Sequence, residues 1–252
     1  MSRTIITNID LINNSDVCTA MSSRLILMLL LILFTGVNCI AQTKKSSKEP
    51  QSKVAPAMPI ALEKELEVFN NDTLVDIYRI SLCADVPNNK KPMDVFYRTE
   101  AGHVFLILQK INTTDTLNKV FGFYPLRGLP IFFSYVKSNI RDNSKREYDI
   151  AITKVLTKEA FLKVINLSLQ FAKKKYHLNK YNCYDYAINI FNAVAGDDTL
   201  PRMRLRYPLF YGKGGSPCSI YKYIKQQKES ALATNILYGN LIAPASTKVH
   251  TK

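Results

Sequence analysis

A cysteine opens an amphipathic helix, and this stretch constrains the fold more than any other. Asn182 is a good N-cap, because its side-chain oxygen can accept a hydrogen bond from an N–H group of the first turn. Apolar residues follow at helical spacing: Cys183, Ala187, Ile190, Phe191 and Val194. Gly196 can end the helix. We therefore expect a core-packed helix with a thiol at its N-terminus.

The position of this thiol bears on its chemistry. The positive end of a helix dipole, with a basic neighbour, can lower a cysteine pKa from about 8.5 to roughly 3.5–7.5. Asp185 in the same turn opposes this effect, since its negative charge disfavours a thiolate. A free cysteine that only fills the core is the alternative interpretation.

One of the three histidines is placed to activate the thiol. His103 precedes the apolar run Val104–Leu108, which is typical of a buried strand. His177 and His250 lie in polar surroundings and are interpreted as surface residues. We therefore predict a nucleophile at Cys183 and a general base at His103. Cys218 also lies near a helix start, but the longer apolar stripe favours Cys183.

The order of these motifs resembles that of a known group of proteins. Gly102-His103 on a strand, followed by Asn182-Cys183-x-Asp185 at a helix start, is similar to the circularly permuted papain-like families. These families include the permuted branch of the NlpC/P60 superfamily and the lecithin:retinol acyltransferase-like proteins. The resemblance covers roughly residues 77–224. It implies an α+β fold in which an antiparallel sheet packs against the cysteine-bearing helix.

The resemblance also implies the roles of site residues. It makes Cys183 the nucleophile and His103 the base, with a third polar residue on the next strand to orient the imidazole. That strand offers Tyr124, with Asn118 at its edge. Tyr181, just before the cysteine, is a candidate oxyanion donor beside the backbone N–H of Cys183.

The N-terminal sequence predicts export. Residues 1–20 have no clear pattern and are interpreted as a non-structural extension. Residues 21–41 are predicted to be a signal peptide, with an apolar stretch at 25–34 and small residues before Gln42. A lipoprotein modified at Cys39 and a retained anchor are the alternatives. Residues 42–59 are rich in Lys, Ser and Pro and are expected to form a flexible linker. A periplasmic or cell-envelope location in a bacterium follows.

The remaining chain predicts one domain at 60–227 and a mobile tail at 228–252. Residues 101–124 are expected to form an antiparallel hairpin and 148–156 a further core strand. Thr157 can cap a long helix, and a last helix is predicted at 218–227. Residues 134–145 are polar and are predicted to be a surface excursion.

Charge and composition limit the partners. The net charge of +14 favours anionic envelope polymers or lipid head groups, or simply a solubilising surface. Export and the lack of a nucleic-acid motif argue against nucleic acid, and membrane contact is expected only through the N-terminal segment. No phosphate loop or metal motif is present, so we expect no cofactor and no metal. Pairing of Cys83 with Cys218 would leave Cys183 free.

Together these features predict an exported cysteine hydrolase of the amidase or peptidase type. It would act through an acyl-enzyme on amide bonds in cell-wall peptides or other small peptides. An acyltransferase or lipid esterase of the same fold is one alternative. A catalytically inactive domain that binds an envelope polymer is the other.

Overall fold

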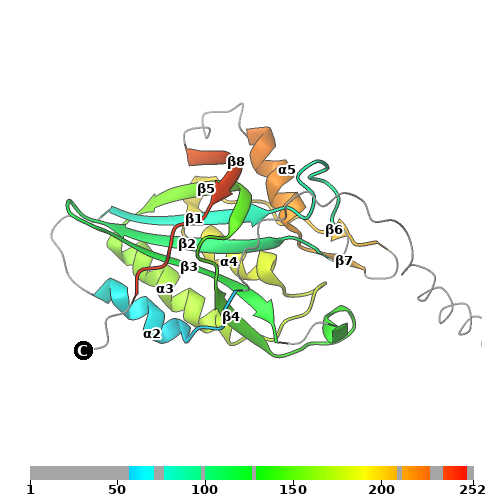
Figure 1. The fold of residues 1–252 in the computed structure, drawn as a ribbon, viewed down its shortest axis with the longest axis horizontal. Coiled ribbons are helices and arrows are strands. Elements are labelled where there is room, and N and C mark those ends of the chain that lie inside the picture. Colours follow the sequence, from blue (N-terminus) through cyan, green and yellow to red (C-terminus); the bar gives the residue numbers. More distant parts are fainter. Residues whose placement is uncertain are drawn as a thin grey trace, which may run out of the picture. The chain divides into compact units, whose positions relative to one another are not determined.

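The computed structural model describes residues 57–70, 77–97, 100–126, 129–208, 212–227 and 235–248. The expected extension, the signal peptide and most of the linker lie outside these residues. The described part forms an α+β domain built on one antiparallel sheet (Figure 1).

Six strands make up this sheet in the order β4-β3-β2-β1-β5-β8. Their bounds are Ile77–Asp85 for β1, His103–Ile111 for β2, Thr116–Pro125 for β3, Ser138–Asp142 for β4, Glu147–Leu156 for β5 and Ile236–Ile242 for β8. Every neighbouring pair is antiparallel. A short hairpin of β6 (Leu205–Arg206) and β7 (Lys213–Gly214) lies apart from the sheet. The predicted hairpin of residues 101–124 is confirmed as β2 and β3.

Helices cover one face of the sheet, and the C-terminal segment crosses the other (Figure 1). The longer helices are α3 (Lys158–Ala172), α4 (Cys183–Ala195) and α5 (Pro217–Gln227). The shorter ones are α2 (Leu62–Leu66), η1 (Glu67–Asn70), η2 (Leu129–Phe132) and η3 (Gly196–Asp198). No helix in the described part of the chain is long and apolar enough to cross a membrane.

Strand alternation divides the core between the two faces. On β2, Val104, Leu106 and Leu108 join the main core beneath α3 and α4. Phe105 and Ile107 belong to a smaller cluster on the opposite face. Because successive side chains point to opposite faces, the face of each β2 residue follows from its place in the sequence.

Two expectations from the sequence are corrected. The predicted surface excursion at 134–145 contains β4, whose Ile140 is buried. The predicted mobile tail contains β8, and residues 243–247 continue from it along the sheet, held by hydrogen bonds to residues 118–120 and 142–146.

Candidate functional site

The N-terminus of α4 holds Cys183 in a capping box. The Asn182 side chain accepts hydrogen bonds from the N–H groups of Tyr184 (2.9 Å) and Asp185 (3.3 Å). In return, the Asp185 carboxylate accepts from the Asn182 N–H (3.1 Å). The predicted N-cap is confirmed, and Cys183 occupies the first helical position. The local sequence therefore fixes the direction in which the thiol leaves the helix.

The sulfur of Cys183 lies in a buried, weakly polar environment. The residue is 8% exposed. Burial raises the pKa of the thiol to about 11, although the backbone N–H groups of Val104 and Tyr184 and the charge of Arg146 act to lower it. The cost of desolvating a thiolate is thus larger than the stabilisation that the helix N-terminus gives it. The resting group is a neutral thiol.

The imidazole of His103 is buried at the first position of β2. Its ring stacks on that of Tyr124, with 4.2 Å between the ring centroids. Burial holds the pKa of His103 well below its usual range, and the nearby Arg146 and Arg141 lower it further. The imidazole is therefore neutral at pH 7 and able to accept a proton.

Cys183 and His103 reach the same end of β2 from opposite faces of the sheet. The sulfur contacts the N–H of Val104, the next residue after His103. The imidazole, however, lies over Gly122, which pairs with Phe105 on the face that α4 does not cover. Among the described residues, no hydrogen bond joins the sulfur to the imidazole.

Asn143 lies close to the imidazole and was not foreseen from the sequence. The Nε2 atom of His103 and the Oδ1 atom of Asn143 lie 2.3 and 2.7 Å from the position of a Cβ on Gly122. Both atoms are buried without a hydrogen-bond partner. They thus lie within a few ångströms of each other. Asn143 follows β4 in the stretch expected to be exposed, so no sequence signal distinguished it.

The structure places the two predicted tyrosines differently. Tyr124 does contact His103, but by ring stacking, and its hydroxyl accepts a hydrogen bond from Asn143 (2.6 Å). The ring of Tyr181 packs edge-on against Phe123. Its hydroxyl lies beside Asn189 on α4. Six residues along a helix correspond to about 9 Å, so this hydroxyl is directed away from the sulfur of Cys183.

Two arginines set the charge around the site. Arg204 pairs with the buried Asp185 (2.5 Å), which compensates the carboxylate beside the thiol. Arg146 pairs with Asp85 (2.6 Å) and lies close enough to Cys183 to lower its pKa. Both arginines lie in loops without a helical or strand pattern, which explains why the sequence did not identify them.

The other two described cysteines are separated by the sheet. Cys83 and Cys218 are both free and buried. Cys83 lies in the smaller cluster and Cys218 in the main core, so the pairing considered from the sequence is not formed. Within the described ranges, no group of three His, Cys, Asp or Glu residues could hold a metal ion.

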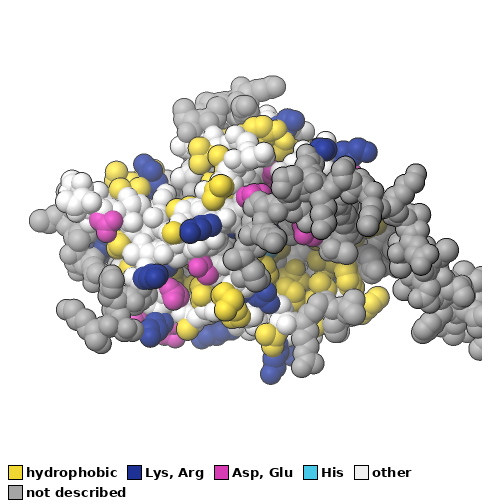
Figure 2. Space-filling model, in the orientation of Figure 1, with side chains coloured by type: hydrophobic (Ala, Val, Ile, Leu, Met, Phe, Trp, Pro, Cys, Tyr) yellow, Lys and Arg dark blue, Asp and Glu magenta, His cyan; other side chains and the backbone are white. Residues whose placement is uncertain are grey.

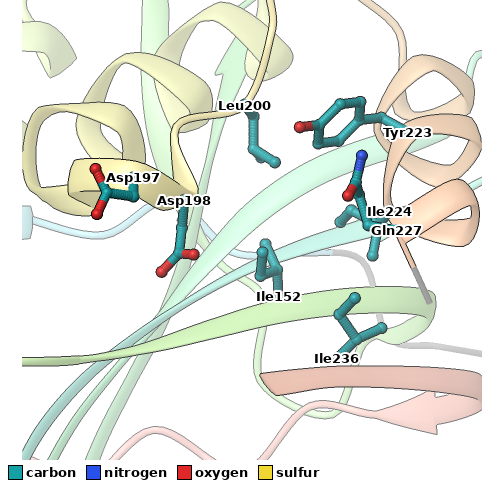
Figure 3. Close-up of a pocket in the computed structure, with 8 residues that line it drawn as sticks. All are labelled: Ile152, Asp197, Asp198, Leu200, Tyr223, Ile224, Gln227 and Ile236. Carbon is teal, nitrogen blue, oxygen red and sulfur yellow. The ribbon is translucent and has the colours of Figure 1, made fainter. Parts of the chain in front are cut away.

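A small cleft lies at the far end of α4 from Cys183. Figure 3 shows its lining: Ile152, Asp197, Asp198, Leu200, Tyr223, Ile224, Gln227 and Ile236. Its free volume of about 20 Å³ suits about one water molecule. A helix of 13 residues is roughly 20 Å long, so this cleft is no part of the thiol site.

Comparisons with known proteins add no assignment. No family model, curated protein or solved structure matches the chain. The residues and their geometry must therefore carry any functional argument.

Proposed function

We propose that this chain is an exported cysteine hydrolase with a permuted papain-like fold. Cys183 is its nucleophile and His103 its general base. One observation carries the proposal: the thiol at the N-terminus of α4 contacts the backbone N–H of Val104, the residue that follows His103 at the start of β2. By resemblance, the substrates are amide bonds in cell-wall or other small peptides.

The proposed reaction is acyl transfer to sulfur and then to water. The sulfur attacks the carbonyl carbon while its proton passes to His103, and the imidazolium then protonates the departing amine. Water hydrolyses the thioester and restores the thiol. The N–H groups of Tyr184 and Asp185 already donate to the Asn182 side chain, so the backbone N–H of Cys183 is the helix donor proposed for the oxyanion.

Protonation and position set two requirements for this reaction. With a thiol pKa of about 11, roughly one sulfur in ten thousand is a thiolate at pH 7. A neutral imidazole must therefore remove the proton during attack. It must reach the sulfur directly or through one water when substrate binds, since catalytic hydrogen bonds often tighten only in the complex.

The same thiol favours a second candidate, a domain that binds an anionic envelope polymer without catalysis. A buried sulfur with a raised pKa behaves as an ordinary core cysteine. The net charge of +14 supplies attraction for a polyanion. An acyltransferase differs from the hydrolase only in the acceptor of the acyl group.

Alkylation of the full-length protein decides between these candidates. Iodoacetamide labelling from pH 5 to 11 would be read by mass spectrometry for each cysteine, with buried Cys83 and Cys218 as internal controls. For the hydrolase we expect Cys183 to label faster than both at pH 7, and this advantage to vanish in His103→Ala and Asn143→Ala. His177 is no neutral control, because it is 4% exposed instead of lying at the surface as expected, and its ring accepts a hydrogen bond from the Asn179 N–H (3.2 Å) in the loop before Cys183. The matched control is therefore His250→Ala, which should change nothing.

A different labelling pattern would rule out the hydrolase. Labelling of Cys183 that rises only near pH 11, at the same rate in His103→Ala, would identify an unactivated thiol. The hydrolase proposal would then be abandoned in favour of the binding domain.

A further inference from the structure

A partly exposed aromatic surface lies beside the N-terminus of α4. We call it the aromatic patch and define it as the exposed Phe133 and Tyr135 with the half-buried Phe96 and Phe132. Phe133 is 79% exposed and Tyr135 is 51% exposed. Ring contacts connect three of its members, with 6.5 Å between the centroids of Phe96 and Phe132 and 6.3 Å between those of Phe132 and Phe133. The Tyr135 ring packs edge-on against His177, at 5.0 Å between centroids.

Hydrogen bonds and ring contacts join this patch to the thiol site. The Leu178 N–H donates to the Ile131 carbonyl (2.9 Å), which attaches η2 to the loop before Cys183. Phe96 packs edge-on against Tyr207, at 5.9 Å between centroids. The Tyr207 hydroxyl and the Asn182 side chain both donate to the carbonyl of Gly215. The patch is thus continuous with the cap of α4.

The chain segments around the patch are basic. Residues 131–141, 171–182 and 201–208 contain nine Lys and Arg residues and no Asp or Glu: Lys137, Arg141, Lys173, Lys174, Lys175, Lys180, Arg202, Arg204 and Arg206. Of these, Arg204 pairs with the buried Asp185, so its charge is compensated. The Lys180 ammonium lies 5.5 Å from the centre of the Tyr135 ring. Asp94, near Phe96, accepts a hydrogen bond from Asn88. Figure 2 shows hydrophobic side chains gathered between β4 and the β6–β7 hairpin.

We propose that the aromatic patch docks the domain on an anionic lipid bilayer. Exposed apolar surface of this kind marks interaction sites. Aromatic rings that enter the interface, together with lysines that meet anionic head groups, are the combination that holds proteins on such membranes. Phe133 carries no group that could hydrogen-bond a sugar, and aliphatic Leu126 is also half exposed nearby, which favours lipid over a polymer.

This docking would place the N-terminus of α4 near the membrane surface. Binding depends on the patch and its charges alone, so it does not require Cys183 to be a nucleophile. A failure of the alkylation test would leave the docking proposal standing. A failure of the vesicle test would likewise leave the hydrolase proposal standing.

A local fluorescent reporter tests the proposal in the full-length chain. The apolar segment at 25–34 could itself enter a bilayer, so overall binding is not informative. The chain contains no tryptophan, which makes Phe133→Trp a unique probe. The matched control is Ile242→Trp, 66% exposed on β8. The control lies far from the patch, because β8 and β4 are opposite edges of the sheet, five strand spacings or roughly 24 Å apart.

Vesicles of phosphatidylglycerol with brominated chains should shift the Phe133→Trp emission to shorter wavelength and quench most of it. The Ile242→Trp emission should stay unchanged, and phosphatidylcholine vesicles should have little effect. The charge reversals Lys137→Glu and Lys180→Glu together should raise, by roughly tenfold or more, the lipid concentration that gives half of the Phe133→Trp emission shift. Circular dichroism would confirm that each variant is folded.

Three outcomes would overturn the proposal. The first is Phe133→Trp emission that does not respond to anionic vesicles. The second is an equal response of Ile242→Trp, which would indicate non-specific adsorption. The third is an equal shift with soluble polyglutamate, which would assign the patch to a polyanion instead of a bilayer.

Discussion

At the scale of single residues, desolvation dominates the candidate site. Burial raises the pKa of Cys183 and lowers that of His103, so each shift removes a charge. A preformed thiolate–imidazolium pair is therefore unfavourable in the resting protein. Proton transfer between two neutral groups, as in serine hydrolases, remains compatible with these pKa directions.

Gly122 is the residue on which the imidazole rests, and it yields a steric prediction. A Cβ there would lie 2.3 Å from His103 Nε2, so Gly122→Ala must displace the ring. We expect a loss of about 1–3 kcal/mol in the free energy of unfolding, as for other overpacked sites. The His103 ring resonances should also move in NMR spectra.

Gly196→Ala is the control for this substitution. Gly196 has a φ of +59°, and a Cβ there would lie 3.7 Å from Lys154 Nζ, so alanine adds backbone strain without a clash. It should destabilise the protein by about 1–3 kcal/mol and leave the His103 resonances in place. Unchanged resonances in Gly122→Ala would contradict the described position of the imidazole.

Asp85 gives a prediction for the pH dependence of stability. Burial raises its pKa to about 6, despite the ion pair with Arg146. The folded protein thus binds this proton more tightly than the unfolded chain. The resulting stabilisation, about 3 kcal/mol, is complete below pH 4 and is lost as the pH rises through 6.

Urea unfolding of wild type and Asp85→Asn at pH 4, 5, 6 and 7 measures this contribution. The wild-type protein should lose stability relative to the variant across this range, because only the carboxylic acid titrates. A difference that grows in favour of wild type with pH would show that the ion pair with Arg146 dominates.

Sequence reasoning located the positions of Cys183 and His103 but not their surroundings. The cap, the apolar stripe and the strand start are local patterns, so they could be predicted. The proximity of Asn143 to His103 depends on how β4 joins the edge of β3, which no local pattern encodes. The pairing of Arg204 with Asp185 likewise depends on the course of an irregular loop.

At the scale of elements, the cap of α4 is the junction of three segments. The Asn182 side chain accepts from two N–H groups of the helix and donates to the carbonyls of Leu178 (2.7 Å) and Gly215 (2.8 Å). It thereby holds α4 to both the preceding and the following loop. Asn182 is buried, so the partner of each lost hydrogen bond would stay buried and could not bond to water instead.

We therefore expect Asn182→Ala to destabilise the protein by about 2–4 kcal/mol in urea unfolding, more than an ordinary cap. Thr157→Ala is the matched control, because Thr157 caps α3 through one exposed bond to Ala160 (3.2 Å) and should cost about 1 kcal/mol. Equal losses in the two variants would mean that the donor bonds of Asn182 contribute nothing.

Some elements were predictable and others were not, for physical reasons. The helices predicted after Thr157 and from Cys183 have apolar stripes, and residues 104–108 of β2 form a continuous apolar run. By contrast, β4 has the sequence SNIRD and buries only Ile140. Strand β8 is a largely exposed edge strand, and its sequence therefore lacks the alternation of apolar and polar residues that a half-buried strand shows. Both edge strands are recognisable only from the sheet that they join.

At the scale of the whole domain, the C-terminal segment closes the sheet. Beyond the end of β4, the outer edge of β3 at residues 118–120 pairs with Ser246 and Thr247. The buried Lys119 forms an ion pair with Glu65 of α2 and donates to the Thr247 carbonyl (2.6 Å). One cation thus connects the first described helix, β3 and the end of the chain.

The same segment supports the turn that carries Asn143. The Ser246 hydroxyl donates to the Asp142 carboxylate (2.9 Å), and the Ser246 N–H donates to the Ser144 hydroxyl (2.7 Å). Both neighbours of Asn143 are therefore tied to Ser246. Loss of this segment should loosen the turn and with it the position of Asn143 next to His103.

Deletion of residues 243–252 tests this closure. The lost hydrogen bonds, at about 0.5–1.5 kcal/mol each, are largely offset by the chain entropy regained, about 1–2 kcal/mol per residue. We therefore expect only a modest fall in the free energy of unfolding, about 2 kcal/mol, but a large local effect. Amide exchange at Asn118 and Val120, which donate to Thr247 and Ser246, should accelerate far more than exchange at core residues such as Phe105. Ser246→Ala, which keeps the backbone in place, should expose Val120 but leave Asn118 protected. Equal acceleration at all three amides in the deletion variant would instead mean that the whole sheet opens, and that the segment stabilises the domain globally.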